Sequence, residues 1–153
     1  MRLLRKIILS LIILTGTIWP GPASAEGINW VSYPEGITRA ARLQRPVMVF
    51  FFSRTCRVCS VMEEKVFSRP EIAGYLNSSL VPVRAEIARE GKLVARYGIS
   101  RSPVIYFLRP DSTTIDFLSG YVEPDKFLEV IRYVGEGNYS KMNFGEYLEK
   151  KRK

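Results

Sequence analysis

The feature that most limits this chain is its pair of cysteines, Cys56 and Cys59, in a sequence that has no histidine. A zinc site needs four ligands, so carboxylates would have to complete one here. Covalent haem attachment needs a histidine directly after the second cysteine, where this chain has Ser60. Chemistry that depends on histidine and scaffolds that depend on several disulfides are therefore excluded. Any sulfur chemistry lies at one place in the chain.

The cysteine pair follows an apolar segment and begins a predicted helix. Residues 46–52 are apolar without alternation, which is typical of a central strand covered on both faces. A helix is predicted from about Cys56 to Phe67. Because free N–H groups and the helix dipole favour an anion at a helix N-terminus, we expect a lowered pKa for the Cys56 thiol. Cys59 is one turn further on, so its sulfur can reach Cys56 and form a small reversible disulfide.

This arrangement predicts thiol–disulfide exchange, with Cys56 as the exposed nucleophile and Cys59 as the buried thiol that resolves the mixed disulfide. Arg57 adds a positive charge beside Cys56; it either lowers the thiol pKa further or is a solvated surface residue. Two other interpretations of the pair stay open. A static disulfide is one, although closing so short a loop stabilises a fold little. Thiolate binding of Cu(I) is the other.

The first 25 residues have the pattern of a targeting segment. Arg2, Arg5 and Lys6 precede an apolar stretch over 7–19, and Ala23–Ser24–Ala25 follows. These are the three parts of a secretory signal peptide, and cleavage is expected after Ala25, which leaves 26–153 as a single domain. The apolar stretch is shorter than the roughly 17–25 residues of a membrane-spanning helix. We expect export to the bacterial periplasm, with an uncleaved membrane anchor as the alternative.

Composition and charge narrow the class of protein further. Of the 153 residues, 46% are hydrophobic and 25% are charged, which is typical of a globular domain. The net charge of +8 is inflated by the first 25 residues, which hold three of the 23 basic residues and none of the 15 acidic ones. The remaining basic residues are scattered and do not alternate with aromatic ones on one element, so we expect no nucleic-acid binding. We expect a monomer.

Strand and helix patterns alternate along the rest of the chain, and the order predicts an α/β domain. A central mixed sheet of four to five strands, with helices on both faces and an extra C-terminal helix, is expected. A C-terminal helical extension is predicted from about residue 138. Strands are predicted over 28–31, 46–52, 80–87, 104–108 and 114–118, and helices over 34–45, 56–67, 71–76, 91–97, 124–134 and around 144–148, with a hairpin turn at 109–112.

Three segments together resemble the thioredoxin superfamily, over about residues 28–134. They are the Cys56–Cys59 pair, the segment 97–104 that contains Ser102–Pro103, and the segment 120–122. The resemblance implies a thioredoxin fold in which Pro103 is cis and packs beside the cysteines, and in which the Ser102 backbone pairs with an extended substrate. Gly120 and Tyr121 would form the third side of the substrate groove. The alternative for Pro103 is a trans proline that begins a strand.

The chain departs from thioredoxin at several positions near the cysteines. Thr55 stands where thioredoxin has a tryptophan, and Arg57–Val58 stands where it has Gly–Pro. The buried acid of thioredoxin would fall at about Phe50, so its usual part in proton transfer is unfilled. Glu63 and Glu86 are possible substitutes, or they are surface carboxylates. These departures predict a cysteine pair that is less reducing than that of thioredoxin.

The resemblance also implies what this chain acts with. It predicts an exported oxidoreductase that exchanges disulfides with protein substrates through Cys56–Cys59, without a cofactor or metal, and that uses an electron donor or acceptor in the membrane. The alternative is a thioredoxin-scaffold binding module that carries Cu(I) or escorts a client protein. A structural adaptor whose cysteines stay oxidised is a third interpretation.

Overall fold

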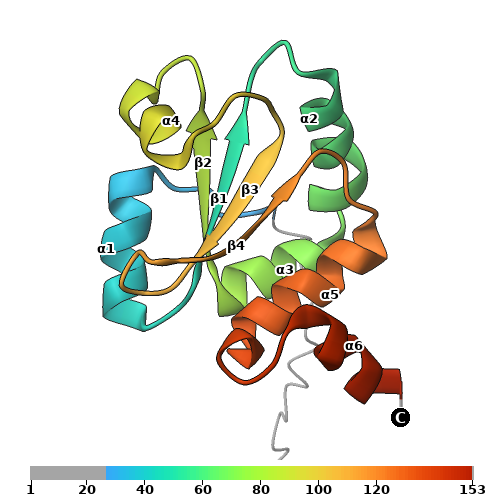
Figure 1. Cartoon of the computed structure of the whole chain (residues 1–153). Coiled ribbons are helices and arrows are strands. Elements are labelled where there is room, and N and C mark those ends of the chain that lie inside the picture. The colour runs from blue at the N-terminus through green and yellow to red at the C-terminus, as the bar shows by residue number, and fades with distance from the viewer. Residues whose placement is uncertain (1–26, 153) are drawn as a thin grey trace, which may run out of the picture.

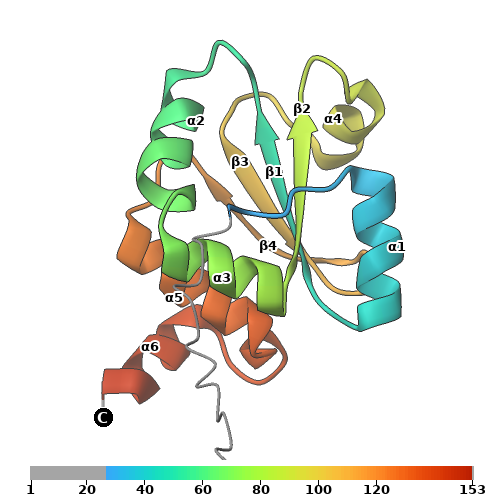
Figure 2. The same cartoon turned by 180° about the vertical axis from the view of Figure 1, so that it is seen from behind.

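The computed structural model describes residues 27–152, and the predicted signal peptide over 1–25 lies outside the described residues. A four-stranded mixed sheet is flanked by helices on both faces (Figures 1 and 2), as the sequence predicts. The strand order is β2-β1-β3-β4. β1 (Val47–Phe52) pairs in parallel with β2 (Val81–Glu86) and antiparallel with β3 (Val104–Leu108). β3 pairs antiparallel with the edge strand β4 (Thr114–Ser119), which gives the predicted hairpin.

The helices divide between the two faces of the sheet. Figures 1 and 2 agree that α1 and α4 lie on one side and that α2, α3 and α5 lie on the other. The elements on the first side are α1 (Tyr33–Leu43) and α4 (Gly91–Tyr97). Those on the second side are α2 (Arg57–Met62), a π-helical turn (Glu63–Phe67), α3 (Pro70–Ser79) and α5 (Pro124–Gly135), followed by a 3₁₀ turn (Asn138–Ser140) and α6 (Phe144–Arg152).

Strand β1 supplies both hydrophobic cores, which explains its unbroken apolar sequence. Successive side chains of a strand point to opposite faces of the sheet. Met48 and Phe50 therefore belong to the core under α2, α3 and α5, while Val47, Val49 and Phe51 belong to the core under α1 and α4. All five side chains have no exposed surface. The strand is fixed from both sides, and so is the segment that follows it.

The predicted strand over 28–31 is wrong. Only Val31 pairs with β2, in an isolated parallel bridge to Val83. Its N–H donates to the Pro82 carbonyl at 3.0 Å, and its carbonyl accepts from the Arg84 N–H at 3.1 Å. A ladder extended back to Asn29 would need an N–H from Pro82, and proline has none. The proline therefore limits this edge of the sheet to a single bridge.

The segment predicted as one helix from Cys56 to Phe67 forms an α-helix followed by a π-helical turn. Cys56 is the N-cap of α2, and the α-helix ends at Met62. The next residues form a π-helical turn, in which the Ser68 N–H donates to the Glu63 carbonyl at 3.1 Å.

The helix predicted over 71–76 is longer than expected. It begins at Pro70, a residue that suits the first turn of a helix, and it ends at Ser79.

Tyr133 of α5 makes aromatic and hydrogen-bond contacts with α6 and the residue before it. The Tyr133 hydroxyl donates to the Met142 carbonyl at 2.7 Å, just before α6 begins. The rings of Phe144 and Tyr147 pack against the Tyr133 ring, with centroids 5.4 and 5.5 Å away. The extra C-terminal helix therefore has its own aromatic contact with the domain. Between residues 27 and 152, no helix combines the length and the apolar character needed to cross a membrane.

A substitution at Gly36 tests how closely α1 packs on β2. A Cβ atom at Gly36 would lie 2.1 Å from Cγ2 of Val83, and a β-branched side chain cannot easily turn away. We expect Gly36→Ala to lower the free energy of unfolding by about 1–3 kcal/mol. Gly74→Ala is the matched control, because its Cβ would meet nothing within 4 Å, and it should raise stability by about 0.5–1 kcal/mol. Urea denaturation of the oxidised variants measures both, and equal effects would contradict the close packing.

Candidate active site

Three segments come together at one end of the sheet. Phe51 on β1 lies opposite Val104 on β3, and Val104 lies opposite Ser119 on β4. The residues that follow β1, those that precede β3 and those that follow β4 therefore emerge at the same end, which is the upper end in Figure 1. The cysteine pair, Ser102–Pro103 and Gly120–Tyr121 belong to these three segments.

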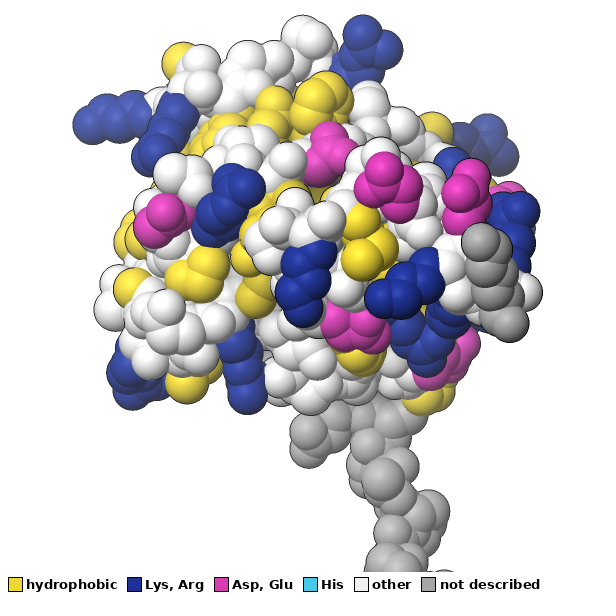
Figure 3. All heavy atoms as spheres, turned by 60° about the horizontal axis from the view of Figure 1, so that its bottom comes forward, with side chains coloured by type: hydrophobic (Ala, Val, Ile, Leu, Met, Phe, Trp, Pro, Cys, Tyr) yellow, Lys and Arg dark blue, Asp and Glu magenta, His cyan; other side chains and the backbone are white. Residues whose placement is uncertain are grey.

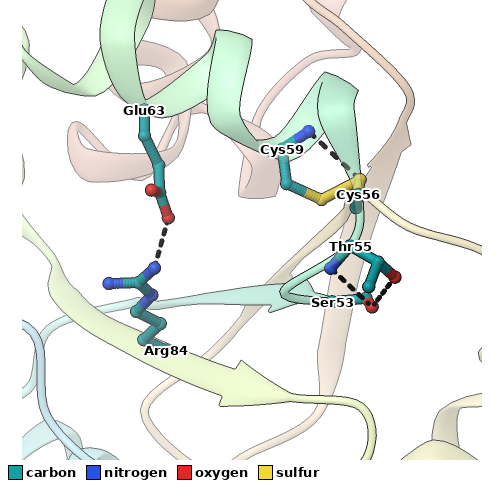
Figure 4. Close-up of a disulfide and its surroundings, with 6 residues drawn as sticks. All are labelled: Ser53, Thr55, Cys56, Cys59, Glu63 and Arg84. Atoms are coloured by element: carbon teal, nitrogen blue, oxygen red, sulfur yellow. Dashed lines mark hydrogen bonds and ion pairs between the residues drawn. A yellow bond between two sulfur atoms is a disulfide. The ribbon is translucent and has the colours of Figure 1, made fainter.

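The two cysteines form a disulfide at the start of α2 (Figure 4). Their Cα atoms are 5.3 Å apart. Cys56 is the N-cap, and its sulfur accepts a hydrogen bond from the Cys59 N–H at an N···S distance of 3.1 Å. The Cys56 N–H itself donates to the Ser53 carbonyl at 3.1 Å, which holds the turn between β1 and α2. In the reduced protein, the Cys59 N–H and the dipole at the helix start would stabilise a Cys56 thiolate.

The two sulfur atoms lie in different surroundings. Cys59 is only 2% exposed and belongs to the core under α2, α3 and α5. Cys56 is partly exposed at the edge of the same core. The next residues, Arg57 and Val58, are exposed, and Val58 retains 41% of its surface. A partner can therefore approach Cys56 more easily than Cys59.

The segment before β3 contains a cis peptide bond between Ser102 and Pro103. Pro103 is buried and Ser102 is partly exposed. The Pro103 carbonyl accepts a hydrogen bond from the Gly120 N–H at 2.9 Å, which joins the second and third segments. Gly120 has a φ of 82°, a conformation that favours glycine. Tyr121 is 37% exposed, and its hydroxyl donates to Glu123 at 3.3 Å.

Met62 connects the third segment to the helix that carries the cysteines. Its sulfur accepts the Val122 N–H at 3.5 Å, and the side chain has no exposed surface. Sequence reasoning did not assign this contact to Met62. A buried methionine one turn after Cys59 indicates only core packing, so its partner is visible only in the folded chain.

Phe50, where the resemblance would place the buried acid of thioredoxin, belongs to an aromatic cluster. Phe50 is fully buried, and its ring lies 5.9 Å from Trp30, 5.7 Å from Phe52 and 5.0 Å from Phe67. Among residues 27–152, the buried side chains include no charged or polar ones. In that part of the chain, no fully buried carboxylate therefore stands behind Cys59.

Glu63 and Glu86, the two possible substitutes for the thioredoxin acid, both form ion pairs with arginines. Glu63 forms an ion pair with Arg84, and its carboxylate points toward that guanidinium in Figure 4. Glu86 is only 14% exposed and forms ion pairs with Arg54 at 2.8 Å and with Arg89 at 3.1 Å. Both carboxylates are therefore members of local ion pairs. Within the described part of the chain, no cluster of three or more potential metal ligands from His, Cys, Asp and Glu occurs.

The difference in exposure predicts unequal reactivity of the two thiols. When the protein is fully reduced and treated with iodoacetamide near neutral pH, we expect Cys56 to be alkylated on the order of tenfold faster than Cys59. Mass spectrometry of the digested protein measures the two rates. The same reaction in urea is the control, since unfolding should make the rates nearly equal. Faster alkylation of Cys59 in the native protein would reverse the assignment of nucleophile and resolving thiol.

Comparison with known proteins agrees with this geometry. The thioredoxin-like domain family matches residues 33–135. The chain is 26% identical over 88 residues to the thiol:disulfide interchange protein DsbD of Neisseria meningitidis. The aligned segment covers 56% of this chain but only 15% of that relative. The chain therefore spans a small part of the curated relatives it matches.

Solved structures share the fold. A thioredoxin from Thermus thermophilus superposes with a TM-score of 0.65 and 28% identity, covering 71% of this chain and 88% of the other. The DsbH oxidoreductase gives a TM-score of 0.66 at 16% identity, covering 75% and 89% of the two chains, which shows a common fold alone. With the family match over most of its length, this chain belongs to the thioredoxin-like domain family.

Proposed function

We propose that this protein is a thiol–disulfide oxidoreductase that exchanges disulfides with other proteins. The observation that carries the proposal is the disulfide between the N-capping Cys56 and the buried Cys59, at the same end of the sheet as Ser102–Pro103 and Gly120–Tyr121. Membership of the thioredoxin-like family and the likeness to a thiol:disulfide interchange protein support it. No cofactor is required, because the electrons pass through the two sulfur atoms.

The exchange runs in two balanced steps. The Cys56 thiolate attacks one sulfur of a substrate disulfide, forms a mixed disulfide, and releases the other substrate sulfur as a thiolate that takes a proton from solvent. The Cys59 thiolate then attacks the Cys56 sulfur, which forms the Cys56–Cys59 disulfide and releases the second substrate thiol. Two electrons move from the cysteine pair to the substrate. The reverse sequence oxidises a substrate dithiol.

A polypeptide substrate fits the surroundings of Cys56. In the described part of the chain, no backbone hydrogen bond uses the N–H or carbonyl of Ser102, which leaves both groups for an extended partner. Val58 and Tyr121 keep 41% and 37% of their surface exposed and would contact the partner's side chains. Ser102, Pro103, Gly120 and Tyr121 are therefore proposed as the substrate-binding residues.

We assign the proposed reaction to the periplasm, on the signal-peptide pattern of residues 1–25. There the pair requires an electron donor in the membrane if it reduces substrates, or an acceptor if it oxidises them. We propose that the protein works as a monomer and does not bind nucleic acid. Arg57, beside Cys56, is proposed to lower the pKa of the attacking thiol.

The reduction potential of the mature protein tests the proposal. Equilibration in glutathione buffers should give a reversible two-electron couple that is less reducing than the value of about −270 mV for thioredoxin and does not exceed about −120 mV. A potential at or below the thioredoxin value would contradict the weaker reductant. Absence of any reversible couple, together with tight binding of Cu(I) to the reduced protein, would favour the metal-carrier alternative.

Cysteine variants test the two roles separately. Cys56→Ser should abolish reduction of a protein disulfide, because no exposed thiol remains to attack it. Cys59→Ser should still attack but should accumulate the mixed disulfide, which a gel without reductant detects. Ser60→Ala is the control, since Ser60 is exposed next to the pair and should keep normal turnover. Full turnover by Cys56→Ser would contradict the mechanism.

A further inference from the structure

Two arginines without carboxylate partners lie in the first and second of the three segments, next to Cys56 and Ser102 in the chain. Arg57 follows Cys56 directly, and Arg101 directly precedes Ser102 in the second segment. Both side chains are exposed. Among residues 27–152, neither guanidinium has a carboxylate within 4.0 Å, although seven other ion pairs occur in that part of the chain. Their positive charges are therefore available to a bound partner.

A second source of positive charge lies at the same end of the sheet. Arg54 and Arg89 share the single carboxylate of Glu86, which is opposite Phe52 at the end of β1. The two arginine side chains are 67% and 70% exposed, whereas Glu86 is 14% exposed. The carboxylate lies beneath two guanidiniums and neutralises one of them, so this group presents net positive charge to solvent.

Acidic side chains also occur near this end of the sheet. Glu63 is paired with Arg84, and Glu90 is the N-cap residue of α4, where its side chain makes no capping hydrogen bond. Glu123 follows the third segment and accepts the Tyr121 hydroxyl. An acidic residue therefore follows the third segment, while the first and second segments carry Arg57 and Arg101.

The opposite end of the molecule carries both paired and unpaired basic side chains. Figure 3, which brings the bottom of Figure 1 forward, shows basic and acidic side chains intermixed among hydrophobic ones. Lys151 pairs with Glu129 at 2.6 Å there, while Arg42, Arg45 and Arg109, at the start of β1 and the end of β3, have no carboxylate within 4.0 Å among residues 27–152. The cysteine end differs in that its unpaired arginines, Arg57 and Arg101, adjoin Cys56 and Ser102 in the chain.

We infer that the protein partner of Cys56 carries carboxylates close to its own cysteine, where Arg57 and Arg101 contact them. This inference rests on the proposed function and names the chemistry of its partner. A partner bound through Cys56 and paired with the Ser102 backbone passes between the first two segments, so residues within about three positions of its cysteine reach both guanidiniums. A guanidinium binds a carboxylate through two parallel N–H groups, which suits recognition of aspartate or glutamate.

Synthetic peptides test the inference directly. Three peptides of equal length would each carry one cysteine as a mixed disulfide with mercaptoethanol, flanked on both sides by Glu, Gln or Lys. We expect the reduced protein to react with the Glu peptide about three- to tenfold faster than with the Gln peptide at low salt, because two exposed pairs contribute on this scale. The faster reaction of the Glu peptide should disappear near 1 M NaCl, where the Debye length is only about 3 Å.

Arginine variants show whether these two residues cause the preference. Arg57→Gln/Arg101→Gln should bring the ratio of the Glu to the Gln rate close to one, and the ratio cancels any change in the intrinsic reactivity of Cys56. Arg42→Gln/Arg45→Gln is the charge-matched control. It alters the end of α1 and the turn that precedes β1, at the opposite end of the sheet from Cys56, and should keep the wild-type ratio.

The outcomes separate this inference from the proposed function. Reaction with none of the peptides and none with the neutral hydroxyethyl disulfide would overturn the proposed function itself. Equal rates with all three peptides, or a faster Lys peptide, would leave the exchange reaction in place and overturn the acidic partner. An equal loss of preference in the α1 control would show that net charge acts at long range, and would overturn the roles of Arg57 and Arg101.

Discussion

The burial of strand β1 on both faces is the constraint on which the rest of the structure depends. Met48 and Phe50 are held in one core and Val47, Val49 and Phe51 in the other, all without exposed surface. A shift of one residue would exchange these side chains between two cores that are packed around different neighbours. Its end therefore has one position, and the turn from Ser53 to Cys56 starts there. β3 and β4 then bring their own loops to the same end through the register of the sheet.

Backbone N–H and carbonyl groups hold the cysteine pair, and an aromatic core lies under it. The Cys59 N–H contacts the Cys56 sulfur at 3.1 Å, and the turn between β1 and α2 is held by the Ser53 carbonyl. Phe50 fills the space behind the cysteines with an aromatic ring, so the low-dielectric side of the disulfide carries no charge there. Positive charge lies on the solvent side instead. Attack by the Cys56 thiolate and recognition of an acidic partner would then draw on the same exposed arginines.

Much of the fold could be predicted because strong local patterns agree with the tertiary structure. The apolar run of β1, the helix ended by Gly98 and the hairpin after Leu108 each have a local physical cause. Residues 28–31 could not be predicted correctly, since the missing N–H that ends their pairing belongs to Pro82, about fifty positions later. The π-helical turn after Met62 was also not foreseen, because the ordinary helical pattern does not distinguish it.

The sequence by itself determined the chemistry available to this protein: one pair of thiols at a helix start, no histidine, and an apolar strand before them. These three features follow from the identity and spacing of residues that are close together in the chain. Only the tertiary structure decided which acids are neutralised by Arg54, Arg84 and Arg89, and that Met62 accepts the Val122 N–H. Those properties depend on segments far apart in the chain, and long-range packing alone sets the distances between them.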